Sequence, residues 1–204
     1  MPSPSPMAAE ILSARPYTLL DDAPAEERRT QAVLNRRWSD PQSSDDLGAL
    51  DAEAIAGVRE EAWPAPNGLD EMHEALMSLA CIAQSETTAQ WAQWLHALAK
   101  TGRAHQLRNG LWVAVERLSC VQAIYADGVP LLPGFDEPWT YDDALAEVLR
   151  ARLGGFGPLT LIEIAAPLGL PVSAVTQALA RLEQEGYLLR GRFSPDARDE
   201  QWCE

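Results

Sequence analysis

The sequence has a single lysine, Lys100, and its 16 basic residues face 30 acidic ones, so the formal net charge is −14 over 204 residues. A protein that coats nucleic acid by diffuse attraction needs a basic surface, and this composition excludes that class. All the other basic residues are arginines, which suit bidentate contacts with phosphate or carboxylate groups. Any nucleic-acid site in this chain is therefore local.

Long apolar runs are also missing, since no stretch approaches the roughly 18 to 20 apolar residues that a membrane helix needs. The first residues, Met1 to Pro6, are rich in Ser and Pro and do not resemble a signal peptide. Cys81, Cys120 and Cys203 lie far apart and fit neither a disulfide framework nor a paired metal motif. We expect a cytoplasmic protein with reduced cysteines and no membrane partner.

The motifs of common catalytic centres are absent. Asp70 to His73 spells a D-E-x-H box, but no G-x-x-x-x-G-K-[ST] loop accompanies it, so we interpret it as the acidic first turn of a helix. His73-Glu74 begins an H-E-x-x-H zinc motif whose second histidine is replaced by Met77. We predict no catalytic residue, no metal site and no bound cofactor in this chain.

The hydrophobic pattern predicts an α+β chain that is mostly helical. Hydrophobic residues form 47% of the sequence, enough to bury a core. One apolar helical stripe is formed by Trp91, Trp94, Leu95 and Leu98. Asn109-Gly110 separates two short alternating runs, which predicts a β-hairpin near 104–115. The predicted helical stretches in this half are 51–62, 69–83 and 87–100.

The pattern divides the chain into a helical subdomain and a smaller C-terminal domain. Prolines and glycines gather at 127–140, which we assign to a linker between a helical subdomain at 1–126 and a domain at 141–195. Residues 196–204 are expected to begin a truncated C-terminal extension.

The last third has the order of a winged helix-turn-helix. A helix at 141–153 is followed by a second one that begins with a Thr160/Glu163 capping box and ends at Gly169. A third helix starts near Pro171, with Val172, Val175, Leu179 and Leu182 expected to face the core. Two short strands are expected around Gly191 within 187–193.

The third helix and the hairpin supply candidate DNA contacts. The residues expected to point outward from the helix are Ser173, Gln177, Arg181 and Gln184. Arg190 and Arg192 lie on the hairpin. One arginine makes the helix a poor reader of base sequence, so shape and backbone contact is the favoured role. Packing or contact with another protein is the alternative.

Four blocks of sequence resemble, in the same order, the large helicase-related (Lhr) family of bacterial and archaeal ATP-dependent DNA helicases. The blocks are AEILSARPYTLLDDAPAEERRTQAVLNRR (9–37), DLGALDAEAIAGVREEAWP (46–64), LWVAVERL (111–118) and LEQEGYLLRGRFSPDARDEQWCE (182–204). In that family two RecA-like motor domains, which bind ATP and Mg, and a winged helix precede an accessory domain that holds the tracking DNA strand. The chain resembles that accessory domain only, so we expect a fragment or a truncated reading frame.

The resemblance implies that an aromatic residue contacts single-stranded DNA, and Trp63 in the EEAWP block is the candidate. The alternative is that Trp63 packs over the following helix. Glu10 and Arg15 are further candidates for strand contact, although the family usually has His and Asn where this chain has Ala9 and Ser13.

Three functions remain open. The first is a non-catalytic module of a DNA-repair helicase that binds single-stranded or tailed DNA beside the RecA-like motor domains. The second is a winged helix that binds protein, which the −14 charge favours. The third is a DNA glycosylase-like module, since the family's C-terminal region elsewhere resembles winged-helix alkylation-repair glycosylases. We identify no catalytic residues for this third function.

Overall fold

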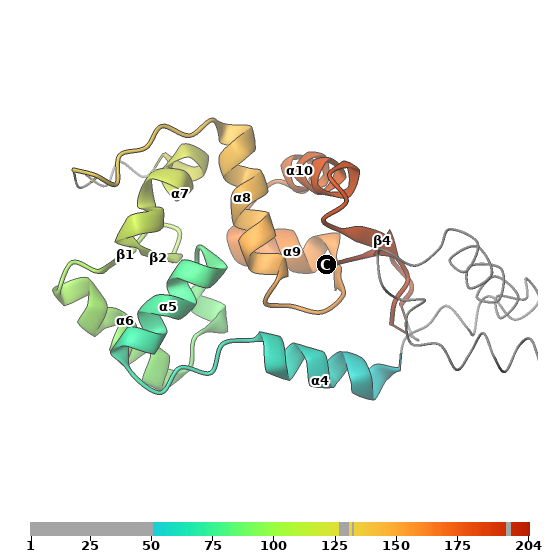
Figure 1. Cartoon of the computed structure of the whole chain (residues 1–204), viewed down its shortest axis with the longest axis horizontal. Helices are drawn as coiled ribbons and strands as arrows, with labels where there is room; N and C mark the ends of the chain where they lie inside the picture. The colour runs from blue at the N-terminus through green and yellow to red at the C-terminus, as the bar shows by residue number, and fades with distance from the viewer. Residues whose placement is uncertain (1–50, 127–130, 132, 195–196) are drawn as a thin grey trace, which may run out of the picture. The chain divides into compact units, whose positions relative to one another are not determined.

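The structure is a computed structural model that describes residues 51–126, 131, 133–194 and 197–204 (Figure 1). The described residues all belong to one compact unit. The described part is mostly helical with two small antiparallel sheets, as expected for an α+β chain.

The first half of this unit contains four α-helices and a hairpin. Their bounds are α4 Ala52–Ala62, α5 Leu69–Leu79, α6 Ala89–Lys100, β1 Ala104–Gln106, β2 Trp112–Ala114 and α7 Leu118–Tyr125. Short 3₁₀ turns lie at Gln84–Glu86 and Val115–Arg117. β1 and β2 pair antiparallel with His105 opposite Val113, and Gly110 takes a φ of 88°, so the predicted hairpin is confirmed.

The second half alternates helices with short strands. Their bounds are α8 Tyr141–Leu153, β3 Leu159–Thr160, α9 Leu161–Leu168, α10 Val172–Gln184, β4 Leu189–Gly191 and β5 Gln201–Cys203. The strand order is β3-β5-β4, and both pairings are antiparallel. Figure 1 shows α8 between α7 and α10, and α8 contacts both of them.

Two hydrophobic clusters hold these elements together. One joins α5, α6 and the hairpin through Met72, Leu95 and Trp112. The other includes Val121 on α7 and Leu149 on α8, and therefore unites residues on both sides of the 127–140 linker. The proposed domain boundary at this linker stays a prediction.

Local signals in the sequence set the helix ends as expected. Asp51 caps α4 by accepting from the Glu53 amide. Thr160 and Glu163 form the predicted capping box of α9, and Gly169 ends that helix with a φ of 64°, a conformation that favours glycine. The Asp70 to His73 segment forms the acidic first turn of α5, as interpreted above.

Three details of the prediction are wrong. The second strand of the C-terminal hairpin is β5 at 201–203 and not part of 187–193, because Trp202 is buried and the Gln201 side chain binds the Phe193 and Ser194 amides. α5 ends at Leu79 rather than Ala83, since Ile82 bridges to Trp112. Val172 is 47% exposed, because it begins α10 outside the core.

The turn between α9 and α10 bends the chain sharply. No single helix among the described residues is long and apolar enough to cross a membrane. α9 and α10 meet that test only when taken together, and they are bent by 119° at the break between them.

Candidate nucleic-acid interface

The exposed face of α10 presents the polar residues that the sequence singles out. Val175, Ala178, Leu179 and Leu182 are the buried residues of this helix. The 3.6-residue period therefore places Ser173, Gln177 and Arg181 on the opposite side, and all three are exposed. The predicted outward orientation of this row is confirmed, while its contact with DNA stays a prediction.

Arg181 is held between two carboxylates. Its Nη1 donates to Oδ1 of Asp143 at 2.8 Å, and its Nε donates to Oε1 of Glu185 at 2.9 Å. The ion-pair network continues through Arg150, Glu147 and Arg117. Three arginines and three carboxylates alternate along it, so the network adds no net positive charge to the α8–α10 surface.

The same contacts displace the pKa values of the paired groups. Hydrogen bonds from Thr140 and then Arg181 lower the pKa of Asp143. A hydrogen bond from Arg181 lowers the pKa of Glu185, and the two carboxylates together raise the pKa of Arg181. All three groups therefore stay charged at neutral pH, and each offsets its neighbours.

The hairpin arginines differ from each other in their surroundings. Arg190 on β4 lies 3.8 Å from Glu183 and 3.7 Å from Glu200, and its guanidinium lies 5.6 Å from the Trp202 ring centroid. Arg192 is exposed and forms no ion pair with any residue that the structure describes. Of these two, Arg192 is the one whose charge is left to attract a phosphate.

Trp63 ends α4 as its C-cap residue and is half-buried. Its ring stacks on Trp91 with centroids 6.0 Å apart and planes at 15°, and it meets Phe156 at 4.7 Å. The ring therefore packs at the junction of α4, α6 and the loop before β3. Stacking of Trp63 on a DNA base stays a prediction.

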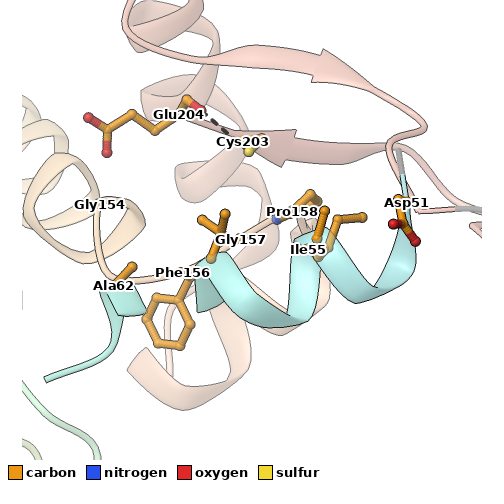
Figure 2. A pocket seen from close by; sticks show the side chains of 11 residues that line it. Asp51, Ile55, Ala62, Gly154, Phe156, Gly157, Pro158, Cys203 and Glu204 are labelled. Atoms are coloured by element: carbon orange, nitrogen blue, oxygen red, sulfur yellow. Dashed lines mark hydrogen bonds between the residues drawn. The ribbon is translucent and has the colours of Figure 1, made fainter. Parts of the chain in front are cut away.

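A hollow of about 320 Å³ lies along α4 (Figure 2). Ile55 and Ala62 from the helix, Phe156 and Pro158 from the loop before β3, and Glu204 line it. Its wall is almost wholly apolar. Arg59 on α4 donates to the carbonyl of Pro158, one of the lining residues. The hollow therefore suits apolar groups better than a phosphate.

Residues 17–200 match the family model described as "DNA glycosylase AlkZ-like". The chain belongs to the AlkZ-like family. The match covers nearly the whole chain. It therefore includes both the helical half and the segment of α8, α9 and α10.

A curated relative agrees with the resemblance seen in the sequence. It is the "Lhr helicase/ probable uracil glycosylase" of Mycolicibacterium smegmatis (strain ATCC 700084 / mc(2)155), 26% identical over 226 residues. The alignment covers 99% of this chain and 15% of the relative. The resemblance to the Lhr family is thus confirmed, and this AlkZ-like chain corresponds to a small part of that relative.

Two other candidate residues, Glu10 and Arg15, lie outside the described residues. Within the described part of this AlkZ-like chain, no group of three or more His, Cys, Asp or Glu side chains could hold a metal ion. His73 instead pairs with Glu116, with Nε2 3.1 Å from Oε2, and so joins α5 to the turn after β2.

The carboxylates that offset Arg181 were not predicted from the sequence. A signal for one of them was present, because Arg181 and Glu185 are spaced i,i+4 on one helix. Asp143 gave no such signal, since it lies 38 residues away on α8 and meets Arg181 only through the packing of the two helices. The two parts of the candidate interface therefore differ in charge. The charge of Arg181 on α10 is offset by carboxylates, whereas that of Arg192 is not offset by any described residue.

Proposed function

We propose that this chain is a DNA-binding module of DNA repair, in which α8, α9, α10 and the β3-β5-β4 sheet act as a winged helix-turn-helix. The observation that supports this most is the element order together with the 119° bend between α9 and α10, within the range of helix-turn-helix units. The exposed row on α10 and the hairpin arginines then form the DNA-facing side.

The charges favour weak binding of strand and backbone over reading of base sequence in duplex DNA. Arg181, the arginine in the outward row of α10, is offset by Asp143 and Glu185, whereas specific major-groove contacts most often use the donors of Arg or Lys on guanine. Arg192 remains for a phosphate, and each phosphate neutralised releases a counterion, so the binding should weaken with salt. We infer modest affinity for single-stranded or tailed DNA.

The family and the relative support the setting of this function. By analogy with an Lhr helicase, the module holds a strand beside RecA-like motor domains, which supply ATP hydrolysis with Mg. Trp63, at the end of α4, is the proposed stacking residue for that strand. Its packing on Trp91 and Phe156 means that any such role uses only the exposed part of the ring.

Fluorescence anisotropy with a labelled single strand and a tailed duplex tests the proposal. We expect binding at about 25 mM salt that weakens by roughly four- to twentyfold at about 200 mM, as one or two phosphate contacts with a single strand predict. Replacing both Arg190 and Arg192 by Gln should weaken it about tenfold and flatten the salt dependence by roughly one to two counterions.

A matched control removes the same charge elsewhere. Lys100→Gln with Arg103→Gln changes α6 and the chain after it, away from the three-helix segment, and should leave the affinity within about twofold. A folded protein that binds no DNA at low salt would contradict the proposal and favour a winged helix that contacts protein. Equal losses of affinity in both double variants would mean that the binding depends on net charge alone and not on the hairpin arginines.

A second candidate is a DNA glycosylase, and two observations favour it: the AlkZ-like family model and the words "probable uracil glycosylase" in the relative's name. Such an enzyme breaks the bond between base and sugar, and needs the base held outside the duplex stack. Incubation with uracil-containing and methylated oligonucleotides, followed by alkaline cleavage at abasic sites, tests it. If the oligonucleotides stay intact after prolonged incubation with excess protein, the glycosylase candidate is rejected and the non-catalytic module is favoured.

A further inference from the structure

A hollow of about 220 Å³ opens between α8 and α10, beside the candidate DNA-facing row. Tyr141, Asp142 and Leu145 line it from α8, and Gln177 and Arg181 line it from α10. Tyr141 is 42% exposed although it is a large aromatic residue. The hollow therefore combines an accessible ring with an amide, a carboxylate and a guanidinium, and it is smaller than the usual pocket for a drug-sized ligand.

The donors and acceptors of the lining residues remain available to a ligand. Arg181 uses its Nε–H for Glu185 and one Nη1–H for Asp143, which leaves three of its five N–H donors, two on Nη2 and one on Nη1. The Gln177 amide offers both donors and an acceptor, and the Asp142 carboxylate offers acceptors only. A planar polar ring with distinct donor and acceptor edges matches this set.

The local charge argues against a phosphate in this hollow. Asp142 lines it, and Asp143 and Glu185 both contact Arg181, so the carboxylates outnumber the guanidinium that they surround. A phosphate there would meet repulsion from these acids. An uncharged base avoids that cost and gains stacking on an aromatic ring, as in proteins that bind single strands.

We propose that the hollow between α8 and α10 binds one unpaired guanine base of a DNA strand, with Tyr141 as the stacking residue. Guanine presents two acceptors, O6 and N7, to an arginine, and its N1–H and N2–H donors face a carboxylate on the other edge. Adenine places a donor, its N6 amino group, where Arg181 also donates, and is disfavoured. This inference rests on the proposed DNA-binding function and names the part of the strand that α10 recognises.

The test uses the full chain and labelled dT oligonucleotides that contain a single central dG or dA. We expect the dG strand to bind about fivefold more tightly than the dA strand at low salt. Tyr141→Ala should weaken binding of the dG strand about fivefold or more. Asp142→Ala, which removes the acceptor of the guanine N1–H and N2–H donors, should remove most of the dG preference. Phe135→Ala is the matched control, since Phe135 is 37% exposed and lines a different hollow.

The outcomes separate this inference from the function on which it rests. Equal affinity for dG and dA, with Tyr141→Ala binding like wild type, overturns the guanine site while the Arg190/Arg192 double variant still reports on DNA binding. Absence of binding to every oligonucleotide overturns both. Circular dichroism checks that each variant is folded, which we expect because Tyr141 and Asp142 are exposed and their loss leaves the core intact.

Discussion

The guanidinium of Arg181 lies 2.8 Å from the carboxylate of Asp143, and this contact joins the outward face of α10 to the first turn of α8. Arg181 is the residue that a reader of DNA sequence would use on this helix, yet its charge is already matched by Asp143 and by Glu185. The excess of acidic residues that gives the chain its −14 charge is thus also present around Arg181. Acids next to the candidate interface limit its attraction for phosphate.

Releasing Arg181 should strengthen DNA binding. Asp143→Asn removes one carboxylate beside Arg181 and keeps the side-chain shape, so we expect about threefold higher affinity for a single strand at low salt. The slope of log affinity against log salt should steepen by up to about 0.7, the value for one more contact with a single-strand phosphate. Anisotropy titrations at several salt concentrations measure both quantities.

The control for this prediction is Asp70→Asn, which changes the net charge equally. Asp70 pairs with Arg103 on the exposed surface of the α5–α6 region, at 2.6 Å. If Asp70→Asn strengthens binding as much as Asp143→Asn, the gain comes from net charge and not from Arg181.

The paired carboxylates also predict how stability depends on acid. The pKa values of Asp143 and Glu185 lie below their ordinary values of 3.8 and 4.5 in the folded protein. Their contribution to the free energy of unfolding is therefore fully present above about pH 5 and is lost as the pH falls through the lowered pKa values. Arg181→Gln should be less stable than wild type at pH 6, and the difference should close towards pH 3. Arg198→Gln removes an arginine that has no ion pair with any described residue. Its free energy of unfolding should change with pH in the same way as that of the wild type.

Trp63 should contribute measurably to the stability of the fold. Its stacking on Trp91 and its contact with Phe156 predict that Trp63→Ala lowers the free energy of unfolding by about 2 kcal/mol in urea titrations. Trp63→Phe should recover about half, because a smaller ring retains part of the contact. A Trp63→Ala protein of unchanged stability would mean that the ring is free to serve a DNA strand alone.

Most helices of this fold were predictable because their signals are local. Asp51, Thr160 and Gly169 act on the residues next to them, through a cap, a capping box and a left-handed turn. The position of β5 was not predictable in this way. β5 pairs with β4 and also with β3, where Leu159 lies opposite Trp202, so this second pairing joins residues about 40 positions apart.

The candidate site also has one part that local sequence predicts and another that depends on tertiary structure. Helical period alone placed Ser173, Gln177 and Arg181 on one exposed face, since their opposite neighbours are apolar. The state of Arg181 needed tertiary structure, because Asp143 reaches it from another helix. The hollow beside Tyr141 needed it too, as only the packing of α8 against α10 brings Tyr141 near Gln177.

Arg152 should be the most consequential charged residue for stability. It is 5% exposed, its Nη1 donates to the Cys81 carbonyl at 2.7 Å, and its Nη2 pairs with Glu86. Arg152→Met leaves the Glu86 carboxylate largely buried without its partner, and breaking such a pair costs about 3 to 5 kcal/mol. Arg152→Met combined with Glu86→Gln should cost clearly less than the single change, because no charge is then left unpaired. Urea unfolding of the two single variants and the double variant measures the coupling.

The matched control for this pair is Arg103→Met, which breaks an ion pair on the surface. Arg103 and Asp70 have side chains that are 40% and 88% exposed, against 6% and 14% for Arg152 and Glu86. Water screens the exposed pair, so Arg103→Met should cost less than about 1 kcal/mol. Similar losses for Arg103→Met and Arg152→Met would show that burial does not determine the strength of the Arg152–Glu86 pair. If the double variant is as unstable as Arg152→Met, the loss of stability comes from the missing hydrogen bond to the Cys81 carbonyl and not from the unpaired Glu86.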